Sequence, residues 1–188
     1  MGKGENSRGA TLVEAAMVFP ILILLIMSTL EIGLVFKDYL TVSYISREGA
    51  RVGALAGNAD EADCAILRGI GTVATAGDLA RIKEIQIFQA NENGAQGATN
   101  LAVYVPGRDP EICNVPAQPS IDAWRFTNIN WDPEGRQTIV GNEKLDIIGV
   151  RVVLTRSWVT GFPPFRGTFD IDESSISRLE PRAFEEQP

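Results

Sequence analysis

The sequence predicts an α+β protein in which one long N-terminal helix continues under a small, largely antiparallel sheet domain that also contains a second helix. Two observations lead to this prediction. Residues 10–56 combine a long apolar run with helical spacing, and after Gly77 the apolar residues alternate as in strands. Helices that precede strands without regular alternation are typical of an α+β layout.

The first helix contains a segment that is apolar enough to enter a membrane. Between Ala10 and Phe36 the only charged residues are Glu14 and Glu31, and a membrane-spanning helix needs about 20 mostly apolar residues. A carboxylate in such a run costs roughly 2.5–3.5 kcal/mol near the membrane centre, so Glu14 is a candidate functional residue with a partner. Pro20 is expected to kink the helix, because proline removes one backbone hydrogen bond.

The flanks of this segment predict its orientation. Lys3 and Arg8 precede it, and cytoplasmic flanks tend to be basic. We therefore expect a single membrane pass with the N-terminus in the cytoplasm and the residues after Phe36 outside. A cleaved secretory signal is the competing interpretation, but no small-x-small cleavage site follows the apolar core.

The N-terminal helix is expected to continue beyond the membrane to Ala56, because its apolar and small residues recur at spacings of three and four. Gly57 then ends it, since glycine commonly follows the last helical residue. Gly49, Gly53 and Gly57 form two successive Gly-x-x-x-Gly spacings, which allow close approach of another backbone. The helix either packs there against the sheet of its own domain or packs against a neighbouring subunit.

The rest of the chain is predicted from shorter signals. The segment 58–61 (Asn-Ala-Asp-Glu) resembles a capping box, which would start a second helix at Ala62 that ends near Gly77. Strands are expected at residues 85–88, 101–105, 148–154 and, as a short last strand, 169–171. Residues 91–100 and 106–144 are expected to be irregular connections.

The composition excludes several classes of function. The net charge of −7 argues against a nucleic-acid partner, because phosphate binding requires clustered lysine and arginine. The chain has no histidine, which removes the usual general base and the histidine ligands of metals. We therefore expect neither an enzyme nor a bound cofactor or metal.

A few side chains remain as candidates for specific roles. Cys64 and Cys113 are expected to form a disulfide, which would close roughly 50 residues and contribute about 4 kcal/mol; two unpaired thiols are the alternative. The acidic segments 60–63 and 170–173 contain oxygen ligands for calcium, but helix capping and an acidic surface also explain them. The three tryptophans are expected to pack in the core and in loops.

The N-terminus resembles a known type of signal. Gly9, four further residues and then Glu14, inside an N-terminal hydrophobic helix, resemble type IV prepilin signals, in which a membrane peptidase cuts after the glycine. The segment that begins at Arg8 (Arg-Gly-Ala-Thr-Leu-Val-Glu) is similar to the TadE-like pseudopilins of tight-adherence (Tad/Flp, type IVc) pili. Ala15 stands where major pilins tend to carry tyrosine, which favours a minor pilin or pseudopilin.

Two later segments carry the same resemblance. They are residues 46–51 (Ser-Arg-Glu-Gly-Ala-Arg) and residues 178–181 (Arg-Leu-Glu-Pro). The resemblance implies a prepilin leader at residues 1–9, a transmembrane and assembly helix at 10–36 and an extracytoplasmic α+β domain at 37–188. It also implies a location in the bacterial inner membrane and then in an extracellular pilus.

The expected function follows from this resemblance. A prepilin peptidase would cut between Gly9 and Ala10, and the new α-amino group of Ala10 would lie one helical turn from Glu14. The expected partners are this peptidase, other pilin or pseudopilin subunits, the assembly machinery and membrane lipid, and the expected roles are pilus assembly or priming and adhesion. The alternative is a permanently anchored envelope protein that keeps its leader and binds a partner through its outer domain.

Overall fold

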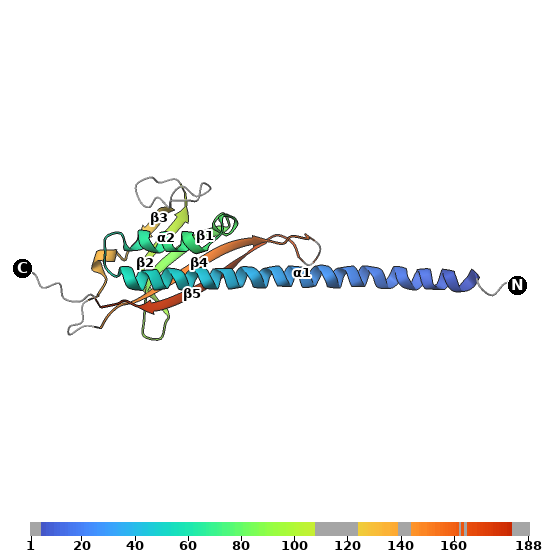
Figure 1. Ribbon diagram of the computed structural model, residues 1–188, viewed down its shortest axis with the longest axis horizontal. Coiled ribbons are helices and arrows are strands. Elements are labelled where there is room, and N and C mark those ends of the chain that lie inside the picture. The colour runs from blue at the N-terminus through green and yellow to red at the C-terminus, as the bar shows by residue number, and fades with distance from the viewer. Residues whose placement is uncertain (1–4, 108–123, 139–143, 162, 164, 182–188) are drawn as a thin grey trace, which may run out of the picture. The chain divides into compact units, whose positions relative to one another are not determined.

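The computed structural model describes residues 5–107, 124–138, 144–161, 163 and 165–181 (Figure 1). In chain order the elements are α1 (Glu5–Ala56), α2 (Ala62–Val73), α3 (Ala76–Leu79), β1 (Ile82–Ala90), β2 (Gln96–Pro106), β3 (Trp124–Ile129), the 3-10 helix η1 (Pro133–Gly135), β4 (Ile147–Ser157) and β5 (Thr168–Arg178). A long helix followed by a small antiparallel sheet confirms the α+β prediction.

The chain forms two compact units. The first contains Met1–Asp38 and Ser157–Gly167, and the second contains Tyr39–Arg156 and Thr168–Pro188. The first unit therefore combines the N-terminal part of α1 with the connection between β4 and β5. The second unit contains the sheet, α2, α3 and the last turns of α1.

The sheet has five strands in the order β3-β2-β1-β4-β5. Strand β1 is central and runs antiparallel to both neighbours, with Ile85 opposite Tyr104 of β2 and Val152 of β4. The core-facing side chains recur with the predicted period of two: they are Ile85 and Ile87 in β1 and Ile148, Val150, Val152 and Leu154 in β4. The three strands that the sequence predicted with clear alternation, β1, β2 and β4, are thus the three inner strands.

The two outer strands show where the sequence prediction was wrong. Strand β3 lies in the region predicted to be irregular, and β5 has 11 residues where a strand of three was expected. Strand β5 carries acidic and hydroxyl side chains along most of its length. Edge strands often carry such polar residues, so they lack the apolar alternation by which inner strands are recognised.

The first helix extends further toward the N-terminus than expected, since α1 begins at Glu5, inside the predicted leader. It ends as predicted: Gly57 has a φ of 61° and donates its N–H to the carbonyl of Gly53 at 3.0 Å. A left-handed residue just past the last turn is a common helix end that glycine adopts without strain. Pro20 lies inside α1, with helix on both sides.

The predicted capping box before α2 was wrong. Glu61 is the N-cap residue, and no side chain caps this helix end. Residues Ala56–Ala62 instead form two successive turns, in which Ala59 and Ala62 donate to the carbonyls of Ala56 and Ala59.

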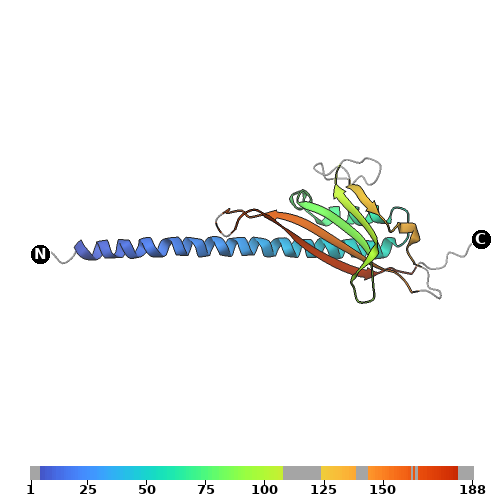
Figure 2. The ribbon, with the colours of Figure 1, turned by 180° about the vertical axis from the view of Figure 1, so that it is seen from behind.

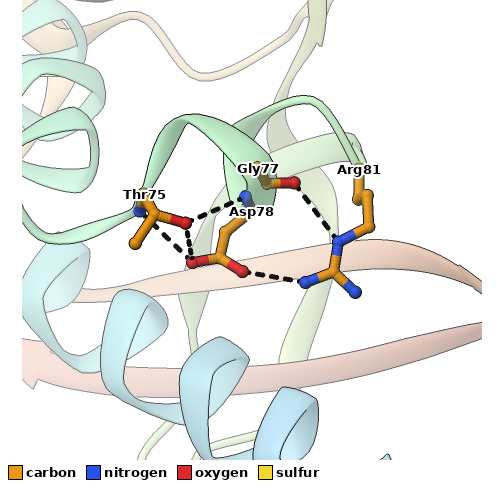
Figure 3. Close-up of polar contacts among 4 residues, drawn as sticks. All are labelled: Thr75, Gly77, Asp78 and Arg81. Atoms are coloured by element: carbon orange, nitrogen blue, oxygen red, sulfur yellow. Dashed lines mark hydrogen bonds and ion pairs between the residues drawn. The ribbon is translucent and has the colours of Figure 1, made fainter.

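A capping box is found 17 residues later, between Thr75 and Asp78 at the start of α3 (Figure 3). Thr75 Oγ1 accepts from the Asp78 N–H at 3.2 Å, and Asp78 Oδ2 accepts from the Thr75 N–H at 3.2 Å and from its hydroxyl at 2.6 Å. Arg81 extends this cluster, with hydrogen bonds to Gly77 O at 3.2 Å and to Asp78 Oδ1 at 2.8 Å. These reciprocal bonds satisfy donors that a helix end leaves open.

The core of the second unit lies between the sheet and two helical segments, α2 and the last turns of α1. These two segments contact each other and β4 (Figures 1 and 2). The buried apolar side chains include Val42, Ile45, Ile66, Leu67, Ile70, Ile85, Ile87, Ile148, Val150, Val152 and Leu154. Burial of each such side chain contributes about 1.5–3 kcal/mol, so this layer stabilises the unit.

Candidate functional site

The N-terminal part of α1 exposes a continuous apolar surface. Leu12 is 72% exposed and Met17 is 69% exposed, and most large apolar side chains up to Phe36 are similarly uncovered. Within the described residues, α1 is the helix that is long and apolar enough to cross a membrane, judged by length and composition. An apolar surface of this extent indicates contact with something other than water.

Gly9, Ala10 and Glu14 all lie on α1 and are exposed. A Cβ added to Gly9 would meet nothing within 4 Å, so its side-chain direction is open. Ala10 and Glu14 are four residues apart and therefore neighbours on one helix face. The predicted roles of these three residues in cleavage and charge pairing stay predictions.

Glu31, the second acid of the apolar run, has surroundings that the sequence did not reveal. It is fully buried, and its Oε1 accepts a hydrogen bond from the backbone N–H of Thr160 at 2.5 Å. A buried carboxylate needs such donors, because its desolvation is otherwise costly. The partner follows 129 residues later and is a backbone group, so no sequence pattern could have identified it.

Thr160 belongs to the connection between β4 and β5, whose described residues are 158–161, 163 and 165–167, and it contacts α1 inside the first unit. An apolar pocket of about 250 Å³ lies between them, lined by Ile23, Leu24, Met27 and Ser28 of the helix and by Thr160, Pro163 and Phe165 of the connection. The rings of Trp158 and Phe165 pack with their centroids 4.9 Å apart. The connection is thus held to the helix by apolar contacts and by the Glu31 hydrogen bond.

The glycines of the predicted packing motif face other elements of the same chain. A Cβ at Gly49 would lie 3.0 Å from Val150 of β4 and 3.1 Å from Ile70 of α2. At Gly53 the corresponding distances are 2.8 Å to Ile148 and 3.0 Å to Ile66 of α2. These two glycines allow α1 to pack closely against α2 and the sheet; Gly57, beside Thr138, supplies the left-handed helix end described above.

The segment 178–181 is attached to this end of α1. The Glu180 N–H donates to the carbonyl of Ala54 at 3.0 Å, and the Leu179 N–H donates to that of Asp146 at 3.0 Å. Ser46 on α1 also shares a 3.0 Å hydrogen bond with Ser175 of β5. The two later segments that carried the resemblance, 46–51 and 178–181, therefore belong to one packed region.

A buried polar cluster connects α2 to the loop after β3. Asp63 forms an ion pair with Arg136 and accepts a hydrogen bond from the Tyr104 hydroxyl at 2.6 Å. The Arg136 guanidinium also lies 4.5 Å from the centroid of the Trp131 ring, a cation–π contact. Burial, followed by the charge of Asp63, raises the pKa of Tyr104, so this tyrosine stays protonated and acts as a donor. The sequence offered no signal for Arg136.

The acidic segments 60–63 and 170–173, the candidate sources of calcium ligands, contain carboxylates that contact other protein groups. Besides Asp63, Asp170 accepts hydrogen bonds from Lys83 and from Thr155, both at 2.7 Å, and the bond from Lys83 lowers the pKa of Asp170. Asp172 is ion-paired with Arg151. In the part of the chain that the structure describes, no group of three or more Cys, Asp and Glu side chains is placed to hold a metal ion.

The tryptophans and the cysteines complete the predicted candidates. Trp124 and Trp131 are buried, while Trp158 lies half-buried in the β4–β5 connection. Cys64 lies on α2, and Cys113 lies outside the described residues, so the disulfide stays a prediction.

Comparison with known proteins addresses the N-terminal part of the chain. Residues 9–51 match the family model described as TadE-like protein. The chain carries a TadE-like N-terminal region. The match confirms, over these residues, the resemblance predicted from the sequence, and it spans Gly9, Glu14 and Gly49. No curated protein and no solved structure is similar to the chain at a significant level.

Proposed function

We propose that this TadE-like chain is a minor pilin or pseudopilin of a Tad-type pilus with a structural, non-enzymatic role. In this proposal the segment 10–36 anchors it in the bacterial inner membrane, with the N-terminus in the cytoplasm. A prepilin peptidase removes residues 1–9. The observation that carries the proposal is a TadE-like helix with an exposed apolar surface and a lone exposed acid five residues after Gly9.

Cleavage would change the charge balance at this helix end. In the uncut chain the Ala10 nitrogen is a neutral amide within α1. After cleavage it becomes a cationic amine at the start of the helix, one turn from the Glu14 carboxylate. In a low-dielectric surrounding each group stabilises the other, whereas an unpaired charge costs several kcal/mol.

The same pairing can position subunits during assembly. If Glu14 pairs with the Ala10 amine of a neighbouring subunit, only one axial register satisfies both charges. The exposed apolar side chains of α1 move from lipid to a bundle of similar helices, which changes their burial little because both surroundings are apolar. Charge pairing therefore selects the register, and apolar contacts stabilise the bundle.

The proposal is tested in the native host with two variants. Gly9→Val should block cleavage, so that mass spectrometry finds a chain that still carries residues 1–9. Glu14→Ala should be cleaved and inserted but should reduce incorporation into pili at least tenfold, measured by immunoblot of sheared pili. Normal incorporation of Glu14→Ala would contradict the role of this acid.

Two controls separate charge pairing from a general loss of acidity. Glu14→Asp keeps the charge and should retain part of the incorporation. Glu61→Ala removes an exposed acid from the second unit, where its carboxylate lies 3.4 Å from the Arg68 guanidinium, and this variant should assemble normally. A wild-type chain that keeps its leader in the mature state would favour a permanently anchored envelope protein that binds a partner through its outer domain.

A further inference from the structure

We propose that the connection between β4 and β5 inserts its apolar side chains into the outer leaflet of the membrane that α1 crosses. This inference rests on the membrane anchoring in the proposed function. It adds a second membrane contact, made by a part of the chain more than 100 residues away from the anchor in sequence.

The position of the contact along α1 is the first observation. The connection lines the pocket with helix residues from Ile23 to Ser28 and hydrogen-bonds to Glu31. At about 1.5 Å per residue, these positions lie about 20–32 Å along the helix from Ala10. The hydrocarbon core of a bilayer is about 30 Å thick, so with Ala10 at the inner boundary the connection meets the helix within the outer leaflet.

The chemistry of the connection is the second observation. Residues 157–165 contain no charged side chain, and Arg166, which follows them, is exposed. Val159 is 71% exposed, and Trp158 is half-buried against Phe165. Tryptophan is enriched at membrane interfaces, and arginine extends its charged end toward the headgroups. This arrangement suits a bilayer surface.

The burial of Glu31 and its hydrogen bond to the connection are the third observation. At the outer boundary a carboxylate on the lipid-facing helix would be exposed to acyl chains, which is unfavourable. Glu31 is fully buried instead, and the connection supplies a backbone N–H to its Oε1. The connection therefore shields the acid where α1 would leave the hydrocarbon, and its own apolar surface continues the exposed apolar surface of the helix.

The experiment measures tryptophan fluorescence of the intact protein in vesicles of phosphatidylethanolamine and phosphatidylglycerol. The signal of Trp158 is the difference between the emission of wild type and that of Trp158→Phe. Trp124 and Trp131 are buried in the second unit and cancel in this difference. We expect the Trp158 emission to be blue-shifted and quenched at least twofold by lipids brominated on their acyl chains, but little affected by aqueous iodide. Val159→Asp should reduce the quenching by brominated lipid, whereas Thr72→Asp, at an exposed site of α2 in the second unit, should not.

The outcomes distinguish this inference from the proposed function. Retention of the protein in the membrane after an alkaline carbonate wash, with Trp158 quenched by iodide and not by brominated lipid, would overturn the inference and leave the anchoring intact. Quenching of Trp158 by brominated lipid in the membrane-anchored protein, followed by quenching by iodide once the protein is assembled into pili, would support the inference. Release of the protein by carbonate would overturn both the anchoring and the inserted connection.

Discussion

The first and last parts of α1 belong to one helix but have opposite surroundings. Up to Phe36 the helix carries large apolar side chains that are exposed, such as Leu12 and Met17. From Val42 onward the residues that face the sheet and α2 are buried, and two of them are the glycines at positions 49 and 53. Large apolar residues are thus used where the helix is mostly exposed and meets only the β4–β5 connection among the described residues, and small residues are used where α2 and β4 approach it closely.

The acids show the same difference. Glu14 is exposed, and its proposed partner is an amine that only proteolysis creates. Glu31 is buried and receives a backbone N–H from a distant connection. Asp63 in the second unit is buried with both a cation and a phenol as partners. An acid in an apolar setting therefore predicts a partner, but its position in the sequence does not reveal what the partner is.

The largest effect on stability is expected where the second unit buries charge. Arg136→Met should lower the free energy of unfolding of this unit by roughly 3–5 kcal/mol, because it leaves the Asp63 carboxylate buried without its cation. Urea unfolding of the detergent-solubilised protein, followed by circular dichroism, measures this loss. Arg51→Met is the matched control, since it removes an exposed ion pair with Glu48 on α1 and should change stability little. Equal losses in the two variants would contradict the importance of burial.

The next effect concerns the predicted disulfide. If Cys64 and Cys113 are bridged, Cys64→Ser combined with Cys113→Ser should lower the free energy of unfolding by up to about 4 kcal/mol, because the unfolded chain gains conformational freedom. Thiol labelling of the denatured wild type should require a reductant. Labelling without reductant would show two free thiols and remove this prediction.

A smaller effect on stability is expected from a glycine-to-alanine substitution, and it should differ between the two parts of α1. Gly53→Ala should destabilise the protein by about 1–3 kcal/mol, because the new Cβ would lie 2.8 Å from Ile148 Cδ1 and force the core to shift. Gly33→Ala meets nothing within 4 Å and should leave the urea midpoint unchanged or raise it, since alanine favours helix over glycine by about 1 kcal/mol. The contrast between the two parts of the helix would be wrong if both variants behaved alike.

The smallest effect is expected at the capping box of α3. Thr75→Ala removes the hydroxyl that caps the Asp78 N–H and should cost about 1 kcal/mol. A matched control is Thr72→Ala, which removes an exposed hydroxyl bonded within α2. The urea midpoints of the two variants measure the difference.

The lowered pKa of Asp78 predicts that the stability of the fold depends on pH. Burial raises the pKa of Asp78, but hydrogen bonds from Thr75 and Arg81 outweigh it, so the pKa is lowered overall. Because the folded pKa lies below the unfolded value, the ionised group stabilises the fold above about pH 4, and this contribution is lost as the pH falls further. The stability advantage of wild type over Asp78→Asn should therefore shrink between about pH 5 and pH 2. A constant difference would contradict this sign.

The features that the sequence predicted correctly depend on local patterns. The long apolar run, the glycine that ends α1 and the alternation in β1, β2 and β4 each lie within one segment, and these patterns directly reflect which face of a helix or strand is covered. The TadE-like region was likewise recognisable from residues close together in the chain.

The features that only the tertiary structure decided depend on groups far apart in the chain. The edge strands β3 and β5 each pair with one neighbouring strand, and β5 places polar residues such as Glu173 and Ser175 at half-buried positions, so an apolar alternation does not mark it. The bonds from Thr160 to Glu31 and from Arg136 to Asp63 join residues separated by 129 and 73 positions. A periodic pattern shows that a face or an acid must be covered, but the group that covers it is selected by packing, because many distant segments carry a suitable donor and only the folded chain brings one of them within reach.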